Sequence, residues 1–336
     1  MKLAVDGTAC LGSFGTGMEA LLRGAPLPAV HADGRAVAAD TSALKARLPA
    51  RALRQIDHFS RMALLCALNA LEDAGIPESP PRDTGIILVS GYGPATPTFE
   101  FQDSILAYGE ILASPLAFSR SVQNIPAATL AVTLHLVGPC ATVCRGDFPV
   151  ADGLCIARQW LEEGRVERVL FGAVDEYSPL LARLTRLRVG MRASRAGREG
   201  LRAALPVSEG AVFFCLTADK DISAFAGKCR RGCIEDILFG RAGNIDPPDN
   251  TGVGTRGEVP VFLSGAVPRR LRALPGMRHV GHVYGNIPIA QAFDAISALS
   301  CGNGLPAGRA LCLAHGTGGR TACLHVRQAE NRGGAS

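Results

Sequence analysis

The chain has 336 residues, 47% of them hydrophobic and 19% charged, and these proportions are typical of a globular protein with a large core. The formal net charge of +5 is spread along the sequence and no basic face is interleaved with aromatic residues, which argues against a nucleic-acid-binding protein. No apolar run reaches the roughly 18 to 20 residues of a membrane helix, and the N-terminus is typical of a first strand. We therefore predict a cytoplasmic protein without a signal peptide or membrane insertion.

The eleven cysteines mostly occupy apolar runs, as Cys66 does. This pattern is typical of buried, reduced thiols in a cytosolic protein. Two pairs, Cys140 with Cys144 and Cys229 with Cys233, have spacings that resemble those of zinc ligands. Because neither is a CxxC pair and no histidine is in step with them, we favour structural thiols and predict no metal site.

The predicted elements of the first half alternate between strands and helices. Residues 85–90 (GIILVS) form a continuous apolar run, which is typical of a strand covered on both faces. Residues 51–74 place apolar side chains at helical spacing until Gly75 ends the pattern. The other elements predicted here are a strand at 3–6, helices at 99–113 and 126–136, a strand–turn–helix at 138–159, and strands at 166–176 and 208–218.

The second half is less regular. Residues 289–300 predict a helix, whereas 261–267 (VFLSGAV) fit a strand or a helix, and the pattern alone does not separate the two. Two apolar runs joined by a glycine-rich turn at 310–326 predict a closing hairpin. Because strands and helices alternate throughout, we predict the α/β class.

Six segments, in the family's order, resemble the β-ketoacyl synthases. They are RQIDHFSRMALLCALNALEDAGI, FSRSVQNIPAATLAVTLHLVGP, FGAVDE, PVSEGAVFFCL, GHVYGNIPIAQAFDAISAL and HGTGGRTACLHV, and they span most of residues 51–326. Next to the second segment, GPCATVCRGDFPVADGLCIARQ (138–159) is similar to the stretch that carries the family's nucleophilic cysteine. Within the family, the sequence looks most like the chain length factors of aryl-polyene and type II polyketide systems.

The resemblance implies a thiolase-like fold. In that fold, two similar βαβαβαββ halves pack as a five-layer α-β-α-β-α domain, and here the halves would be 1–218 and 219–336. The family assembles as dimers in which the strand before the nucleophile pairs across the interface. By resemblance, SVQNIPAA (121–128) and GPCATVC (138–144) would face a partner subunit.

At the position of the family's nucleophilic cysteine stands Asp147. A carboxylate is a poor acyl acceptor, so we predict that this position is inactive, and we favour a helix N-cap as its role. Cys144, three residues earlier, is the nearest thiol. Because the turn aims one residue at the pocket, a shift to Cys144 is disfavoured, and Cys140 on the preceding strand is disfavoured further.

The resemblance places His282, in GHVYG, at the family's second catalytic histidine, where it would stabilise an oxyanion. A buried histidine bonded to the backbone is an equally weighted interpretation. The first catalytic histidine has no counterpart, since the sequence has no histidine between His135 and His279. Asn244 falls near that position; it can donate a hydrogen bond but cannot become cationic.

Two further features lie close to the predicted site by resemblance. Phe148 follows the nucleophile position, where a bulky side chain gates the family's acyl tunnel, and simple core packing is equally weighted. Gly316, Gly318 and Gly319 would present backbone N–H groups as an oxyanion turn. For these glycines we favour the simpler interpretation, a hairpin turn that needs positive φ angles.

Seven arginines lie between residues 183 and 202. A solvated surface is the favoured interpretation. The functional alternative is docking of an acidic acyl carrier protein or its phosphopantetheine phosphate. The residues assigned to that role are Arg183, Arg186, Arg188 and Arg192.

Together these observations predict a ketosynthase-like subunit that does not condense. It would pair with an active β-ketoacyl synthase and shape its acyl tunnel, as chain length factors do; a homodimer is the other assembly considered. The alternative is an enzyme with an atypical site, either a condensing synthase that uses Cys144 or a malonyl-carrier decarboxylase. We predict no cofactor beyond the phosphopantetheine of an acyl carrier protein, which delivers the acyl chain.

Overall fold

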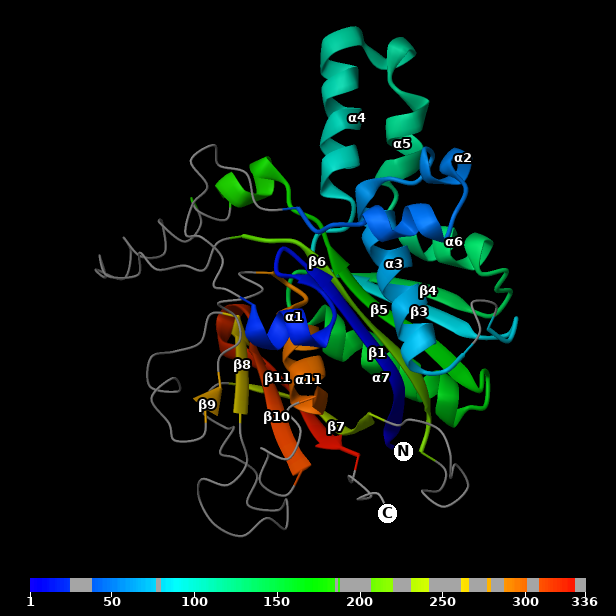
Figure 1. Ribbon diagram of the computed structural model, residues 1–336. Helices are drawn as coiled ribbons and strands as arrows, with labels where there is room; N and C mark the ends of the chain where they lie inside the picture. The colour runs from blue at the N-terminus through cyan, green and yellow to red at the C-terminus, as the bar shows by residue number, and fades with distance from the viewer. Residues whose placement is uncertain are drawn as a thin grey trace, which may run out of the picture.

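The computed structural model describes residues 1–24, 38–76, 80–184, 187, 207–219, 231–241, 261–265, 277–278, 287–300 and 308–329 (Figure 1). The strands are β1 Leu3–Gly12, β2 Gly15–Thr16, β3 Gly85–Ser90, β4 Cys140–Cys144, β5 Arg168–Asp175, β6 Gly210–Ala218, β7 Gly232–Arg241, β8 Val261–Gly265, β9 Met277–Arg278, β10 Arg309–His315 and β11 Arg320–Gln328. The helices are α1 Met18–Arg23, α2 Ala50–Leu53, α3 His58–Asp73, α4 Ala95–Tyr108, α5 Pro115–Ser121, α6 Ile125–Thr133, α7 Pro149–Glu162 and α11 Ala290–Ser300, with 3-10 turns η1 Ser42–Ala46, η2 Glu110–Leu112 and η5 Thr317–Gly319.

The strands form two sets with the same topology. In the first set the order is β4-β3-β5-β6-β1, and in the second it is β9-β8-β10-β11-β7. In each set the first three strands are parallel and the remaining two pairings are antiparallel. An antiparallel pairing of β1 with β7 joins the sets into one sheet. The two sets of strands therefore have the same topology, as the predicted thiolase-like fold requires. Along the chain, β6 is the last strand of the first set.

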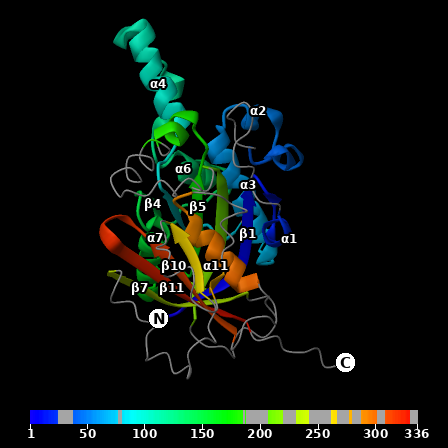
Figure 2. The ribbon, with the colours of Figure 1, turned by 90° about the vertical axis from the view of Figure 1, so that its left-hand side faces the viewer.

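Two apolar cores separate the layers. α7 and α11 lie between the two sets of strands and share one core with the inner faces of both. α3 and α6 cover the outer face of the first set and bury a second core there, in which Phe59, Leu130 and Phe213 meet. In the part of the chain that the structure describes, four of the five predicted layers are present in the predicted order (Figures 1 and 2).

Most predicted elements are present, and the differences have local causes. The helix predicted at 51–74 is divided into α2 and α3, because the Asp57 carboxylate accepts the Ser60 N–H at 2.8 Å and starts a new helix at His58. The helix predicted at 99–113 is α4, which begins at Ala95 and ends at Tyr108, where Gly109 with φ 78° forms the C-cap. The ambiguous segment at 261–267 contains strand β8.

A helical arm projects from the body of the protein. It consists of α4, η2 and α5, and both ribbon views show α4 standing away from the sheet (Figures 1 and 2). Phe101 and Phe118 join α4 and α5 with ring centroids 5.2 Å apart. At the far end of the arm Leu106 and Ile111 are 85% and 98% exposed. The arm therefore has a small core of its own and an apolar outer surface.

None of the described helices is long and apolar enough to cross a membrane. Within the same residues, no group of three or more His, Cys, Asp or Glu side chains is placed to hold a metal ion.

Candidate functional site

The turn between β4 and α7 is the centre of the predicted site. β4 ends at Cys144, and α7 begins at Pro149, whose missing N–H costs nothing in the first turn of a helix. The residue before it, Phe148, has φ 58° and ψ 36°, a left-handed conformation that is uncommon for a bulky residue. Phe148 is the N-cap of α7, and its side chain makes no capping hydrogen bond. The prediction that Asp147 is the N-cap is therefore wrong.

Instead, Asp147 forms an ion pair with the closing hairpin. Its Oδ2 atom accepts a hydrogen bond from Nη2 of Arg320 at 2.9 Å, and the Asp147 side chain is mostly buried whereas that of Arg320 is about half exposed. Arg320 is the first residue of β11, 173 positions further along the chain. The carboxylate at the predicted nucleophile position thus connects two loops that only the fold brings together.

Gly316 makes the closest approach between these two loops. A Cβ atom added there would lie 2.6 Å from Cζ of Phe148 and 3.0 Å from Cγ of Asp147. Real Cβ atoms do not tolerate the shorter of these distances, so the hairpin needs a glycine at this point. The predicted oxyanion turn and the predicted nucleophile position are therefore in direct contact.

The backbone of the closing turn is largely engaged in its own structure. The Gly316 N–H donates to the Arg320 carbonyl oxygen at 3.0 Å. Gly318 and Gly319 have φ 67° and 74°, and a Cβ at either would meet nothing within 4 Å. Their positive φ angles, and not crowding, require glycine there, as in a hairpin turn.

Phe148 is buried between the two halves. Its ring packs against Gly316 and lies 6.5 Å from the ring of Phe239 on β7 in a T-shaped arrangement. Such an aromatic contact contributes about 0.5–1.5 kcal/mol beyond burial. The side chain thus fixes the turn against the second set of strands.

Polar groups gather at the carboxyl ends of β3, β4 and β5. Asp175, the last residue of β5, accepts on Oδ1 from the Ser90 hydroxyl at 2.7 Å and from the Gly91 N–H at 2.9 Å. Burial raises the pKa of Asp175 to about 6. Cys144 lies opposite Ser90 in the register of β3 and β4, and burial followed by the Asp175 charge raises the pKa of its thiol. Cys144 is therefore protonated near neutral pH, which makes it a poor nucleophile.

A second group of buried acids lies at the base of the arm. Glu209 accepts the Ala39 N–H at 2.6 Å, the Tyr177 N–H at 3.0 Å and a bond from Nε2 of His58 at 2.8 Å, and this bond raises the pKa of His58. Glu176 accepts the Thr96 N–H at 2.7 Å at the start of α4, and burial raises its pKa to about 7.

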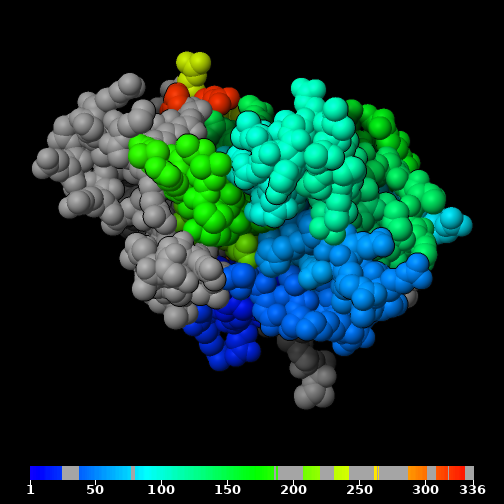
Figure 3. Space-filling model, turned by 90° about the horizontal axis from the view of Figure 1, so that it is seen from above, coloured from blue at the N-terminus to red at the C-terminus, as the bar shows by residue number. Residues whose placement is uncertain are grey.

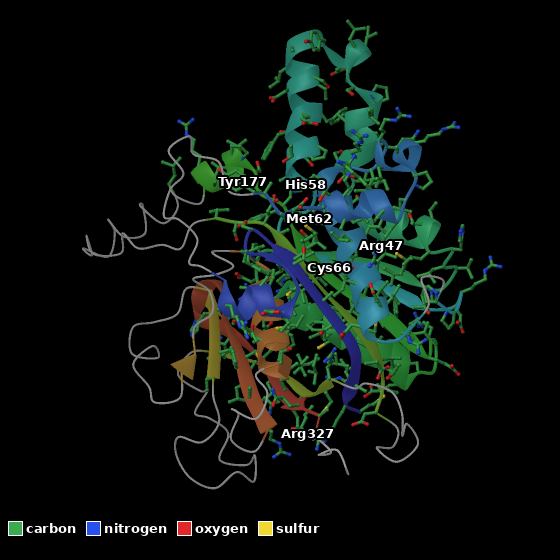
Figure 4. All side chains as sticks on the ribbon, in the orientation of Figure 1. Arg47, His58, Met62, Cys66, Tyr177 and Arg327 are labelled. Atoms are coloured by element: carbon green, nitrogen blue, oxygen red, sulfur yellow. The ribbon has the colours of Figure 1, made fainter. Side chains whose placement is uncertain are left out.

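The views show how this group is placed. Figure 4 shows His58 beneath α4 and Tyr177 to the left of it, both at the upper end of the sheet. The space-filling view of that end shows the arm beside the segment that follows β5 (Figure 3). The acids therefore connect the arm to the strand ends that carry Asp175.

Several predicted site residues lie outside the described residues, so their positions stay predictions. These are His282, Asn244, Arg186, Arg188 and Arg192. Arg183 is described and exposed. The structure brings together Asp147, Phe148 and Gly316, while Gly318 and Gly319 lie further round the hairpin.

Sequence reasoning did not assign the partners that fix the site. Arg320 carries no signal, because an arginine after a glycine turn is typical of any exposed hairpin. Asp175 had a weak signal, a carboxylate directly after a buried strand in FGAVDE. Glu209 lies in the segment PVSEGAVFFCL, whose pattern does not indicate its three contacts.

Solved structures define the class of fold. The chain is similar to "The ishigamide ketosynthase/chain length factor", with a TM-score of 0.75 and 18% identity over 98% of this chain and 99% of that one. It is also similar to a type II PKS acyl-carrier protein in complex with its ketosynthase bound to the hexaketide (AntDE:AntF), with a TM-score of 0.71 and 13% identity over 98% and 99%. A third similar structure is the ketosynthase from module 6 of the bacillaene synthase from Bacillus subtilis 168. Its TM-score is 0.67 and its sequence identity 15%, over 98% of this chain and 72% of that one. These likenesses establish the thiolase-like ketosynthase fold.

The sequence itself gives the family. The model of the beta-ketoacyl synthase N-terminal domain matches residues 29–206, which is more than half of the chain. The chain therefore belongs to the β-ketoacyl synthase family. No curated protein matches its sequence.

Proposed function

We propose that this chain is a non-condensing ketosynthase-like subunit, which pairs with an active β-ketoacyl synthase and shapes its acyl tunnel as a chain length factor does. The observation that carries the proposal is the Asp147–Arg320 ion pair, at the place where the family holds its cysteine. Acyl transfer needs a thiolate or an equivalent nucleophile there, and a carboxylate paired with a guanidinium is neither free nor a good acyl acceptor.

The surrounding groups support the same proposal. The half-buried thiol of Cys144 has a raised pKa, so it does not substitute for the missing thiolate. The sequence also lacks a histidine between His135 and His279, where the family has its first catalytic histidine. Condensation would therefore have lost both its nucleophile and one oxyanion donor.

The comparison with solved structures also supports pairing with a second subunit and delivery of acyl chains by a carrier protein. One structural neighbour is a ketosynthase/chain length factor and another is an acyl-carrier protein in complex with its ketosynthase. In this chain, β4 lies at the end of the strand order and the arm is apolar outside, which suits association with a second subunit. Acyl chains would arrive on the phosphopantetheine of a carrier protein, without another cofactor, and Arg183 is an exposed candidate for carrier docking.

Co-purification with the active ketosynthase encoded nearby tests the proposal. We expect a complex of the two chains, and a change in product length when Phe148 is replaced by alanine. The chain alone should not extend an acyl chain. A strictly homodimeric protein that extends acyl chains by itself would contradict the proposal.

The variant Asp147→Cys tests whether only the nucleophile was lost. We expect no gain of condensing activity, because Phe148 still packs against Gly316 beside the turn and the first histidine is still missing. Release of CO2 from malonyl carrier by the wild-type chain, lost in His282→Ala, would instead support a decarboxylase. Acyl transfer that is lost on alkylation of Cys144 by iodoacetamide would support condensation through that thiol.

A further inference from the structure

The helical arm is attached to the body of the protein through a narrow base. Every residue of α4 is described, and of these Ala95 and Pro97 in the first turn alone are buried. The later turns pack within the arm, against η2 and α5. Gly93, just before the helix, has φ 69°, a conformation that favours glycine. This construction is typical of a hinge, because the chain can bend at the end of an element where few buried side chains must move.

One carboxylate spans this hinge. Glu176, the residue after β5, is buried, and its Oε1 atom accepts the Thr96 N–H at 2.7 Å. Thr96 lies in the first turn of α4, where backbone N–H groups have no partner within the helix. The N-cap residue, Pro94, makes no side-chain capping bond, so Glu176 satisfies this N–H from the body. Glu176 therefore connects the sheet to the start of the arm.

Further ionisable groups converge on Glu176. Glu209, buried before β6, accepts the Tyr177 N–H at 3.0 Å and a bond from Nε2 of His58 at 2.8 Å. His58 is the first residue of α3, and the Asp57 carboxylate caps the same helix. The start of α3, the start of α4 and the ends of β5 and β6 thus meet around one group of buried acids and a histidine.

The neighbouring elements add little positive charge to this group. Arg61, on the next turn of α3, is bonded through its guanidinium group to the Leu53 carbonyl oxygen. The first turn of α4 has the uncharged sequence Ala-Thr-Pro-Thr, and Glu100 beyond it is exposed. Asp40 is exposed and bonded within its own turn. The charge balance at the hinge therefore depends mainly on the protonation of the buried acids and the histidine.

This protonation changes near neutral pH. Burial raises the pKa of Glu176 to about 7, and the charges of Asp57 and Glu209 act in the same direction. The hydrogen bond to Glu209 raises the pKa of His58. At mildly acidic pH Glu176 is therefore neutral, and a charged His58 lies against Glu209. At mildly alkaline pH three carboxylates lie beside a neutral histidine, and Glu176 is hydrated only when the base of the arm opens.

We propose that Glu176 and His58 form a proton-operated hinge, which holds the arm against the body when both are protonated and releases it when both lose their protons. A neutral Glu176 still accepts the Thr96 N–H through its carbonyl oxygen, so the closed arm keeps its cap. The ionised group is more stable in water than buried, so proton loss favours the open arm. The inference concerns the chain alone and does not depend on the proposed ketosynthase partner.

The size of the effect follows from the pKa of Glu176 in the two positions of the arm. It is about 7 in the closed arm, and we take the ordinary value of 4.5 for the open, hydrated one. The equilibrium constant for opening then rises about tenfold between about pH 6 and pH 8 and levels off above the higher pKa. Loss of the His58 proton acts in the same direction, because a raised pKa means that the closed state binds the proton more tightly.

Hydrogen exchange of the purified full chain, followed by mass spectrometry between about pH 6 and pH 8, tests the hinge. The peptide that contains the start of α4 reports opening once its rate is divided by the intrinsic exchange rate at each pH. We expect its protection to fall about tenfold over the range and to stay below that of α7 throughout. Protection that does not change with pH would overturn the proposal. Equal protection of the two peptides at every pH would show global unfolding, and would also overturn it.

Two matched substitutions separate the hinge carboxylate from other acids. Glu176→Gln keeps an oxygen for the Thr96 N–H and cannot ionise, so the start of α4 should lose most of its pH dependence. Glu100→Gln makes the same change at an exposed position of α4 and should keep the tenfold fall of the wild type. Circular dichroism at both ends of the range checks that the variants are folded. A Glu176→Gln variant with the wild-type pH dependence would contradict the proposal.

The variant His58→Gln tests the coupling without changing Glu176. Glutamine can donate to Glu209 but carries no charge. Because the charge of His58 lowers the pKa of Glu176, protection in this variant should level off at a higher pH than in the wild type. A packing role for His58 would leave that pH unchanged, and this result would overturn the two-proton hinge. The proposed function is tested separately by co-purification, so failure of one proposal does not decide the other.

Discussion

The variant Asp175→Asn tests the electrostatics of the strand ends beside the candidate site. Asp175 is buried, and its Oδ1 accepts from the Ser90 hydroxyl and from the N–H groups of Gly91 and Tyr92 at 2.7, 2.9 and 3.3 Å. Asparagine keeps an oxygen for these three bonds and removes the charge. The variant therefore isolates the effect of burying a carboxylate.

The direction of the effect follows from the pKa. Burial raises the pKa of Asp175 from 3.8 to about 6, so the folded state binds the proton more tightly than the unfolded chain. This contribution to stability is complete below the unfolded pKa and is lost as the pH rises through the folded pKa. At about 1.4 kcal/mol per pKa unit, the loss amounts to about 3 kcal/mol.

Urea unfolding of both proteins between about pH 4 and pH 7.5 measures this difference. As the pH rises over this range, we expect the free energy of unfolding of Asp175→Asn to increase relative to that of the wild type. The change in this difference should reach up to about 3 kcal/mol. Burial also raises the pKa of Glu176, but that residue is present in both proteins and cancels in the comparison. Asp103→Asn, at an exposed carboxylate on α4, is the matched control. If the difference in free energy of unfolding between the two proteins stays constant from about pH 4 to pH 7.5, the reasoning is refuted.

Two further variants test the contact between the loops. Gly316→Ala should lower the free energy of unfolding by about 1–3 kcal/mol, because its Cβ would lie 2.6 Å from the Phe148 ring. The control is Gly146→Ala, whose Cβ meets nothing within 4 Å. Equal unfolding midpoints for the two variants would contradict this account. Arg320→Ala should lower the free energy of unfolding by about 1 kcal/mol at low salt and by less at high salt, since its ion pair with Asp147 is partly exposed. A loss of stability that does not depend on salt would argue against an electrostatic role.

The sequence predicted the elements well where one physical pattern was dominant. The run at 85–90 is strand β3 with the predicted ends, because an apolar strand buried on both faces has a sharp boundary. The helix at 51–74 was predicted without its break, since the capping role of Asp57 depends on the orientation of one side chain. The strand–turn–helix at 138–159 was placed correctly by its motif.

The contacts of the candidate site could not be predicted from the sequence. The motif indicated Asp147 as the residue at the nucleophile position, yet its partner Arg320 lies in a hairpin whose sequence has no preference for a carboxylate. The same holds for Gly316, which was noted for its turn, while its close approach to Phe148 depends on how the two halves pack. Periodicity and propensity describe neighbours along the chain, and they contain no information on such long-range pairs.

The Asp147–Arg320 pair also bears on why the architecture would persist without condensation. A condensing site keeps its nucleophile free to react, so that residue contributes little to holding the loops together. Here the same position connects α7 to the closing hairpin, and Phe148 and Gly316 pack beside it. Replacing Asp147 by cysteine would therefore remove a structural contact and add a thiol, so its first measurable effect should be on stability. If Asp147→Cys unfolds more easily than the wild type while gaining no activity, the turn at Asp147 serves the fold.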